Sequence, residues 1–411
     1  MEENCINYQA ECYMNKKIKI LLIAGQFYPD IAGSAVATYF IAESLALRGY
    51  EATVIIDSLS KSALEKRPHK FKAEYVDNYK KCMVGDIGFK KVTEDVYSII
   101  KRSKCDIIHV YSYLPMLILS LFRDSLNTPV VFTFWSTPFK LERSIGFYRK
   151  SILDMQLSTA IIKMEKYDLM ILGSRSNYNS AIAQGANKRK TYMAYHGINM
   201  PEFDRYLRES SKIDITEYIG ENLKPGEILL MLPGRITKRK GVSETIDAFI
   251  LVNKKHPCKL LLTGMIKPYD QEYADELLLK ISKLNVNDKI LIPKKIIYRD
   301  VLAAFYKRAN VVITPSYFEG LGFTAIEALY SARPLVATNV QGLNEVVINN
   351  KNGLLVPPRD ARRLAEAIIA LLEDKKLAMR LSSAGPDSVK IFNMENFVDF
   401  LIKKYTILLT K

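Results

Sequence analysis

Short apolar runs recur along the 411-residue chain, and most are followed by a segment long enough for a helix. Runs without polar alternation are typical of parallel strands that are buried on both faces. Strands that alternate with helices imply right-handed crossovers and a doubly wound α/β sheet. The runs lie at Lys19–Ala24, Thr53–Ile56, Ile107–Val110, Val130–Phe134, Leu169–Leu172, Ile228–Leu232, Leu260–Thr263, Ile290–Pro293 and Val311–Thr314.

The chain length and one interruption of this pattern predict two domains. A chain of 411 residues is too long for one ordinary hydrophobic core. The charged stretch Pro201–Gly226 breaks the alternation and predicts a connection. We therefore expect a dispensable extension at 1–16, a first domain at 17–200, a linker at 201–226, a second domain at 227–390 and a terminal helix at 391–411.

Composition excludes several classes of protein. The net charge of +15 is spread over both halves, which favours phosphate-bearing ligands or an anionic membrane over nucleic acid. The five cysteines have no Cys-x-x-Cys spacing and the four histidines are scattered, so neither a metal site nor a disulfide framework is predicted. The most apolar run, Leu114–Phe122, is too short to span a bilayer, and we see no leader pattern. We expect a cytoplasmic protein, with peripheral contact at the inner face of the membrane as an alternative.

The strand at Val311–Thr314 leads into a loop with the features of an anion site. Gly320-Leu321-Gly322 precedes a helical stretch, whose first amides can hold a phosphate. Glu319 and Glu327 bracket this loop, and a buried carboxylate needs donors such as the two hydroxyls of a vicinal diol. A phosphate and a diol together describe a sugar nucleotide. The alternatives are a solvated Glu319 and an ordinary helix surface charge at Glu327.

Two further loops favour an anionic ligand. Four cations at Arg235, Lys238, Arg239 and Lys240 directly follow a strand, and they would repel each other unless an anion lay among them. A solvated basic turn is the alternative. The loop 25–34 also joins a strand to a helix, but its glycine spacing does not match the dinucleotide fingerprint, which disfavours an NAD-dependent dehydrogenase.

These motifs resemble family 4 of the retaining glycosyltransferases. The resemblance rests on Pro315-Ser316, Glu319-Gly320-Leu321-Gly322, Glu327-Ala328, Pro334 and Gly342. It implies the GT-B fold, in which two Rossmann-like doubly wound domains face each other across a cleft and the C-terminal helix crosses back to the first domain. Residues 17–200 would then bind the acceptor and residues 227–390 the nucleotide sugar, which is a co-substrate and the only small-molecule partner besides the acceptor.

The resemblance also implies roles for single residues. Arg235 and Lys240 would clamp the donor diphosphate and Glu319 would lie near the transferred sugar, and these three form the expected catalytic set. Lys238 and Arg239 receive no role. The expected donor-binding residues are Gly33, Gly320, Leu321, Gly322, Phe323, Glu327 and Pro293.

One position departs from the family pattern. The family usually has a histidine near the end of the strand Val130–Phe134, where this chain has Trp135, its only tryptophan. We expect Trp135 and His109 on the acceptor or sugar side, with a core role for Trp135 as the alternative.

The predicted activity is retaining, metal-independent transfer of a hexose-type sugar from a nucleotide diphosphate sugar, with a UDP-sugar favoured. The acceptor would be a hydroxyl of a saccharide, a lipid-linked molecule or a small molecule, in polysaccharide, glycolipid or glycoconjugate biosynthesis. A non-catalytic sugar-nucleotide-binding protein and a nucleotide-sugar epimerase remain as alternatives.

Overall fold

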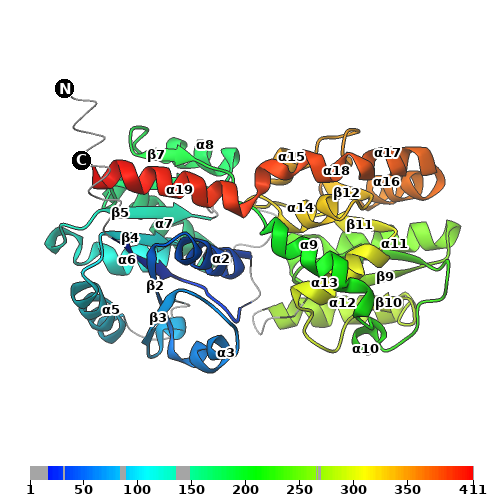
Figure 1. The fold of residues 1–411 in the computed structure, drawn as a ribbon. Helices are drawn as coiled ribbons and strands as arrows, with labels where there is room; N and C mark the ends of the chain where they lie inside the picture. The colour runs from blue at the N-terminus through cyan, green and yellow to red at the C-terminus, as the bar shows by residue number, and fades with distance from the viewer. Residues whose placement is uncertain are drawn as a thin grey trace. The chain divides into compact units, whose positions relative to one another are not determined.

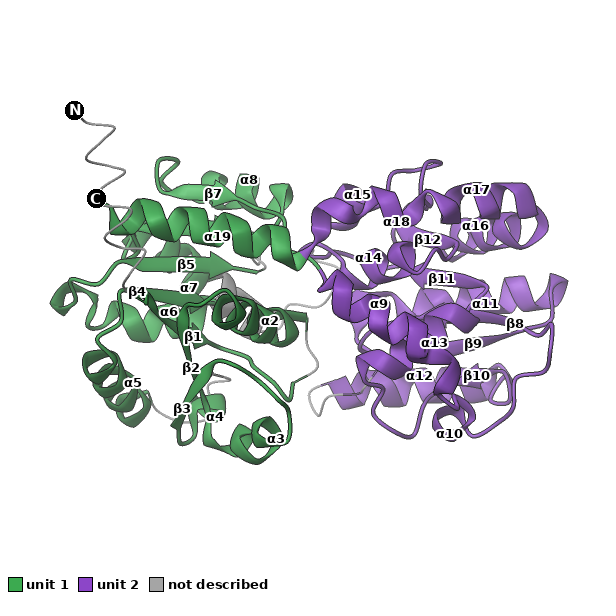
Figure 2. Cartoon of the chain, viewed as in Figure 1, with its two compact units in different colours: residues 1–197, 394–411 green, residues 198–393 purple. Residues whose placement is uncertain are grey.

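The computed structural model describes residues 17–30, 33–83, 89–135, 149–264, 266 and 270–410. These residues form two compact units, which Figure 2 shows in different colours. Unit 1 contains residues 1–197 together with 394–411, and unit 2 contains residues 198–393.

Unit 1 is built on a parallel sheet that has seven strands in the described ranges, in the order β3-β2-β1-β4-β5-β6-β7. β1 lies between β2 and β4, and Ile20 pairs with both Ala52 and Ile107. Strands β4, β5 and β6 are buried throughout, as their continuous apolar sequence predicts. The strands are β1 (Lys19–Ala24), β2 (Glu51–Asp57), β3 (Lys72–Val76), β4 (Ile107–Tyr111), β5 (Val130–Phe134), β6 (Leu169–Leu172) and β7 (Thr191–Met193).

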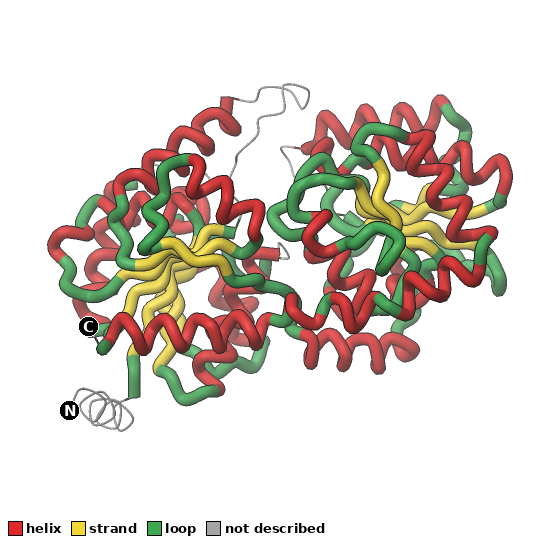
Figure 3. Tube along the Cα trace, turned by 90° about the horizontal axis from the view of Figure 1, so that it is seen from above, coloured by secondary structure: helices red, strands yellow, loops and turns green. Residues whose placement is uncertain are grey.

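Helices cover both faces of this sheet, as Figure 3 shows. Successive residues of a strand point to opposite faces, so Leu21 packs in one core and Leu22 in the other. The first core is closed by α5, α6, α7 and α8, and the second by α2 and α19. The helices of unit 1 are α2 (Gly33–Leu47), α3 (Lys61–Glu65), α4 (Tyr79–Met83), α5 (Lys90–Ser103), α6 (Tyr113–Ser120), α7 (Arg149–Met164), α8 (Arg175–Ala183) and α19 (Met394–Leu409).

The C-terminal helix α19 belongs to unit 1, as expected, and is red in Figure 1. Its residues Phe397 and Tyr405 are 1% exposed and lie in the core beside α2. Arg48, just after α2, pairs with Glu395 and with Asp399 of α19. The predicted return of the chain to the first domain is therefore confirmed.

Unit 2 repeats the architecture with a parallel sheet of six strands among its described residues, in the order β10-β9-β8-β11-β12-β13. Together the two sheets confirm the predicted pair of Rossmann-like folds. The strands are β8 (Ile228–Leu232), β9 (Cys258–Leu262), β10 (Ile290–Leu291), β11 (Val311–Thr314), β12 (Leu335–Thr338) and β13 (Leu354–Val356). The helices are α9 (Met200–Glu209), α10 (Thr216–Ile219), α11 (Val242–Lys255), α12 (Gln271–Lys283), α13 (Arg299–Arg308), α14 (Phe323–Tyr330), α15 (Leu343–Val346), α16 (Ala361–Glu373), α17 (Lys375–Ser383) and α18 (Gly385–Ser388).

The stretch Pro201–Gly226, expected as a linker, contains α9 and α10 and groups with unit 2. Phe203 of α9 is 1% exposed, and its ring centroid lies 6.2 Å from that of Tyr306 on α13. Asp204 accepts a hydrogen bond from Tyr330 at 2.9 Å. These contacts attach the stretch to the second fold. The expected extension at 1–16 lies outside the described residues.

No helix within the described ranges is long and apolar enough to cross a bilayer.

Candidate active site

In both sheets the strand order reverses at one point, and ligands of open α/β sheets bind beyond the carboxyl ends of the strands at such a point. In unit 2 the reversal lies between the neighbouring strands β8 and β11. The loops that follow them are the basic loop 233–241 and the glycine loop 315–322. The fold therefore brings together the two loops that the sequence predicts to bind one anion.

Close backbone approaches hold these loops against each other. Gly241 has φ +64°, and a Cβ there would lie 2.3 Å from the carbonyl oxygen of Pro315. Gly234 has φ +107°, and a Cβ there would lie 3.4 Å from Cε of Lys240 and 3.7 Å from Cγ2 of Thr324. The Lys240 side chain therefore passes over Gly234, beside the first turn of α14.

Glu319 lies at the centre of this arrangement. Its Oε1 accepts hydrogen bonds from Nζ of Lys240 at 2.6 Å and from Oγ of Ser316 at 2.8 Å. Its Oε2 lies 2.9 Å from Nη1 of Arg239. The side chains of Glu319 and Lys240 are each 11% exposed, so the solvated alternative for Glu319 is wrong.

Burial and the neighbouring cations shape the ionisation of this cluster. Burial alone would raise the pKa of Glu319, but Arg239 and Lys240 hold that pKa well below its usual range. Burial lowers the pKa of Lys240, which Glu319 opposes. Glu319 is therefore a carboxylate at neutral pH, in contact with the cations that could otherwise bind an anionic ligand.

The N-terminus of α14 lies beside the cluster, and no side-chain cap from Gly322 covers it. Gly322 precedes this helix with φ +94°, and a Cβ there would lie 2.6 Å from Cδ2 of Leu343. Leu321 is 3% exposed and packs inward, whereas Gly320 and Phe323 are partly exposed. Amides in the first turn of a helix attract anions.

Two hydroxyls near the same loops keep unused hydrogen-bonding capacity. Oγ1 of Thr237 and Oγ1 of Thr314 are buried, and neither has a hydrogen-bond partner among the described residues. Buried polar atoms of this kind suit a site that a ligand completes.

Glu327 is 2% exposed on α14, so the alternative of a helix surface charge is wrong. Nη1 of Arg299 lies 2.9 Å from its Oε1, and the hydroxyl of Tyr306 donates to Oε2 at 3.0 Å. Arg299 and Tyr306 thus supply the hydrogen-bond donors that the sequence analysis expected from a sugar diol. Pro293 follows β10, an edge strand separated from β8 by β9.

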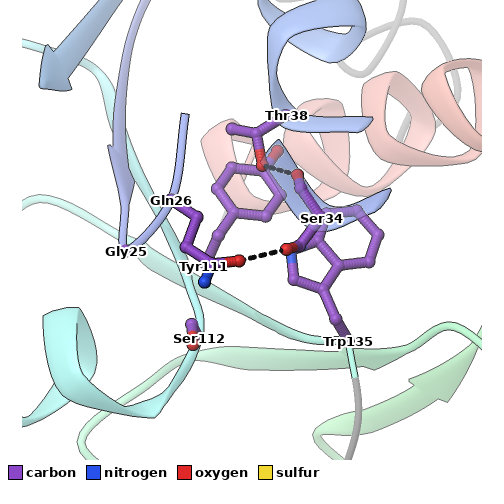
Figure 4. A pocket seen from close by; sticks show the side chains of 7 residues that line it. All are labelled: Gly25, Gln26, Ser34, Thr38, Tyr111, Ser112 and Trp135. Atoms are coloured by element: carbon purple, nitrogen blue, oxygen red, sulfur yellow. Dashed lines mark hydrogen bonds between the residues drawn. The ribbon is translucent and has the colours of Figure 1, made fainter. Parts of the chain in front are cut away.

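A small hollow occupies the reversal point of the unit 1 sheet, between β1 and β4 (Figure 4). The hollow is small, with an empty volume of about 190 Å³ that includes space open to solvent. Oγ of Ser34 donates to Oε1 of Gln26 at 2.7 Å, and Oγ1 of Thr38 donates to the carbonyl oxygen of Ser34 at 2.9 Å. The lining residues carry no charge; they are Gly25, Gln26, Ser34, Thr38, Tyr111, Ser112 and Trp135.

Trp135 lines this hollow and also packs inward. Its indole stacks on Tyr111 at 5.5 Å between centroids and 12° between planes, and it lies 4.7 Å from the ring of His196. Phe397 of α19 is 6.0 Å away. The half-buried Trp135 side chain therefore both contacts core residues and lines the hollow.

His109 does not reach the hollow, contrary to the expectation of a sugar-side role. It is 0% exposed on β4, and its ring nitrogens hydrogen-bond the hydroxyls of Tyr405 and Thr133. Burial lowers its pKa to about 3. We therefore leave His109 out of the site. Gly33, expected beside the donor phosphates, is the first residue of α2 and is partly exposed.

Several residues that the sequence reasoning missed lie in these sites. Arg239 was grouped with the basic loop but received no role, and only its contact with Glu319 singles it out. Gln26 and Ser34 belong to the loop that drew attention through its glycines. Ser112 has φ +80° at the end of β4, a strained value that sequence does not predict. No group of three metal-ligating side chains occurs within the described ranges.

Comparisons with known proteins agree with this fold. The model described as "Glycosyltransferase Family 4" matches residues 31–201, and "Glycosyl transferases group 1" matches residues 214–388. An uncharacterised glycosyltransferase of Methanocaldococcus jannaschii is 23% identical over 95% of this chain and 98% of its own length. CapM of Staphylococcus aureus, a capsular polysaccharide biosynthesis glycosyltransferase, is 28% identical over 49% of this chain and 50% of its own.

Solved structures share the complete fold. Sucrose-phosphate synthase from Thermosynechococcus elongatus superposes with a TM-score of 0.77 and 23% identity, over 96% of this chain and 100% of that one. HepE of Anabaena, in complex with UDP and glucose, superposes with a TM-score of 0.75 and 17% identity, over 94% of this chain and 99% of that one. The fold and site define a glycosyltransferase of the GT-B class. The two family models together account for most of the chain. The chain therefore belongs to glycosyltransferase family 4, and its second unit carries the domain described as glycosyl transferases group 1. It transfers a sugar from a nucleotide sugar.

Proposed function

We propose that the chain transfers a hexose-type sugar from a UDP-sugar to an acceptor hydroxyl, with retention at the anomeric carbon. The observation that carries the proposal is the Lys240–Glu319 cluster beside the N-terminus of α14, at the reversal point of the unit 2 sheet. UDP and glucose in the Anabaena structure support the choice of donor. CapM supports an acceptor in polysaccharide, glycolipid or glycoconjugate biosynthesis.

The proposed reaction places growing negative charge on the departing diphosphate. Arg235 and Lys240 lie on the loop that follows β8, and the N-terminus of α14 comes directly after the loop that follows β11, so positive groups from both can stabilise such charge. Lys240 would move its ammonium from Glu319 to the diphosphate. Glu319 would then accept a hydrogen bond from a hydroxyl of the transferred sugar. We propose that no metal ion is needed, because Arg235 and Lys240 supply the positive charge that a metal ion would supply.

We assign the acceptor end to the hollow of unit 1. Its lining offers an amide, hydroxyls and the indole of Trp135. This chemistry suits uncharged sugar hydroxyls, which donate and accept hydrogen bonds and pack their C–H faces on aromatic rings. Its small volume holds one part of an acceptor, such as the end of a saccharide, a lipid-linked saccharide or a small molecule.

The donor assignment is tested with variants of the basic loop. We expect Arg235→Ala and Lys240→Ala to lower kcat/KM by about 10²-fold or more, because each removes a group that acts on developing charge. Lys238→Ala is the matched control, because this side chain is exposed in the same loop. Near-normal kinetics of both variants would contradict the assignment. Nucleotide-sugar binding without transfer to any acceptor would favour a non-catalytic binding protein.

A further inference from the structure

The guanidinium of Arg239 is fixed inside the candidate site, although the family resemblance gives this residue no role. Its Nη1 lies 2.9 Å from Oε2 of Glu319 and donates to the carbonyl oxygen of Phe318 at 2.8 Å. Its Cζ lies 5.1 Å from the centroid of the Phe318 ring. The carbonyl oxygen of Arg239 also accepts from the N–H of Tyr317 at 2.8 Å. Both its side chain and its backbone are thus attached to the loop that carries Glu319.

The two oxygens of Glu319 have separate cationic partners. Oε1 is held by Lys240, while Oε2 is held by Arg239. If the donor diphosphate takes over the ammonium of Lys240, as the proposed function requires, Oε1 loses its cation. A carboxylate that is only 11% exposed would then be costly to keep ionised unless a second cation stayed with it.

We propose that Arg239 is a positioning residue that keeps Glu319 ionised and in place while Lys240 binds the donor diphosphate. A guanidinium suits this role because it remains charged at every working pH and holds its hydrogens in a rigid plane. The carbonyl and ring of Phe318 stop it from following Lys240 toward the diphosphate. This inference rests on the proposed function and adds a residue to its machinery.

Few groups around Glu319 affect its protonation. Arg239 and Lys240 are the charged groups that shift the pKa of Glu319. Ser316 faces it with a hydroxyl. The backbone of Glu319 contacts the loop before α15, because its N–H donates to the carbonyl oxygen of Gln341 and its carbonyl oxygen lies against Gly342. A proton taken up on binding therefore reports on the two cations.

The test is calorimetry of UDP binding, at about pH 5 and about pH 7, in buffers that differ in ionisation enthalpy. In Arg239→Met, UDP draws Lys240 away and leaves Glu319 without a cation, so Glu319 takes up a proton near pH 5. We expect an additional uptake of up to about one proton per UDP relative to the wild type. Arg239→Lys keeps the charge and should take up much less.

Lys238→Met is the matched control, because it removes one charge from the same loop. The Lys238 side chain is exposed and has no hydrogen bond or ion pair with any described residue. We expect it to reproduce the wild-type proton count. Should Arg239→Met lose its cooperative unfolding transition, Arg239→Gln carries the same comparison, because its amide can still donate to the Phe318 carbonyl oxygen.

Two results would overturn the inference while the proposed function stands. If Arg239→Met weakens UDP equally at both pH values without extra proton uptake, Arg239 binds the diphosphate directly. If it only lowers Tm and keeps the wild-type proton count, Arg239 is purely structural. A wild-type chain that binds none of UDP, GDP and ADP would instead remove the proposed function, and this inference with it.

Discussion

At the scale of single residues, the two buried carboxylates of unit 2 are compensated differently. Glu319 is held by Lys240 and Arg239 on loops that follow two neighbouring strands, where an anionic ligand can compete for the same cations. Glu327 is held by Arg299 and Tyr306 inside the fold. The contacts of Glu319 can therefore rearrange when a ligand binds. The contacts of Glu327 instead stabilise α14, whose N-terminus belongs to the site.

The half-buried Trp135 predicts a separation of recognition from stability. Trp135→Ala should cost up to about 3 kcal/mol of unfolding free energy, because the contacts with Tyr111 and His196 are lost. Trp135→Phe keeps much of this packing but lacks the indole N–H, so it should raise the KM for acceptor more than it lowers stability. UDP affinity, assigned to unit 2, should stay the same. Steady-state kinetics with a normal acceptor KM for Trp135→Phe would assign Trp135 to the core alone.

Two buried histidines predict a pH dependence of stability. Burial lowers the pKa of His109 to about 3 and that of His196 to about 4. An unfolded histidine titrates at about 6.5, so below that pH the unfolded state binds protons that the folded state refuses. The free energy of unfolding should therefore fall as pH drops from about 7 to about 5, by up to about 1.4 kcal/mol per pH unit for each histidine.

The variant His109→Gln checks this origin. It should reduce the slope of unfolding free energy against pH by up to about 1.4 kcal/mol per pH unit, which corresponds to one proton. This change in slope is expected at any absolute stability of the variant. Urea unfolding at several pH values gives the slope directly. A slope equal to that of the wild type would show that His109 is protonated in the folded chain.

At the scale of elements, the close approach of the two site loops can be tested with a pair of glycines. Gly241 and Gly226 both have positive φ, of +64° and +79°, but a Cβ on Gly226 meets nothing within 4 Å. Gly226→Ala should cost only the backbone penalty of about 1–2 kcal/mol. Gly241→Ala should cost more and also weaken UDP, because it pushes the Pro315 carbonyl away. Equal urea midpoints and equal UDP affinities for the two variants would contradict this.

The strands that the sequence predicts are those buried on both faces of the sheet. Nine apolar runs became strands because central parallel strands are covered on both faces. The edge strand β3, Lys72–Val76, is not among these runs, since four of its five residues are partly exposed or exposed. The α9–α10 stretch was taken for a linker because the partners of Phe203 and Asp204 lie more than 100 residues away in sequence.

The candidate site was partly predictable for a related reason. The family resemblance placed Lys240 and Glu319 in one expected site, and both follow strands that a doubly wound sheet can place side by side, but their direct contact was not predicted. Arg239 could not be told from Lys238, because a run of cations does not show which side chain faces a carboxylate. His109 was misplaced because its partner Tyr405 lies 296 residues away.

At the scale of the whole molecule, unit 2 is one continuous segment, whereas unit 1 needs the last residues of the chain. α19 contributes Met394, Phe397, Val398, Leu401 and Tyr405 to the unit 1 core. Removal of this helix would expose the face of the sheet on which α2 packs. Assays of function therefore require the full chain.

We propose that the full chain moves a sugar from a nucleoside diphosphate to a hydroxyl with retention. The most direct measurement follows the anomeric carbon by NMR, with a UDP-hexose labelled at C1 and a set of uncharged saccharide acceptors. We predict that UDP and an α-linked product appear together from an α-linked donor, and that Lys240→Ala slows the formation of both by about 10²-fold or more. A β-linked product, or UDP release that Lys240→Ala leaves unchanged, would contradict the account.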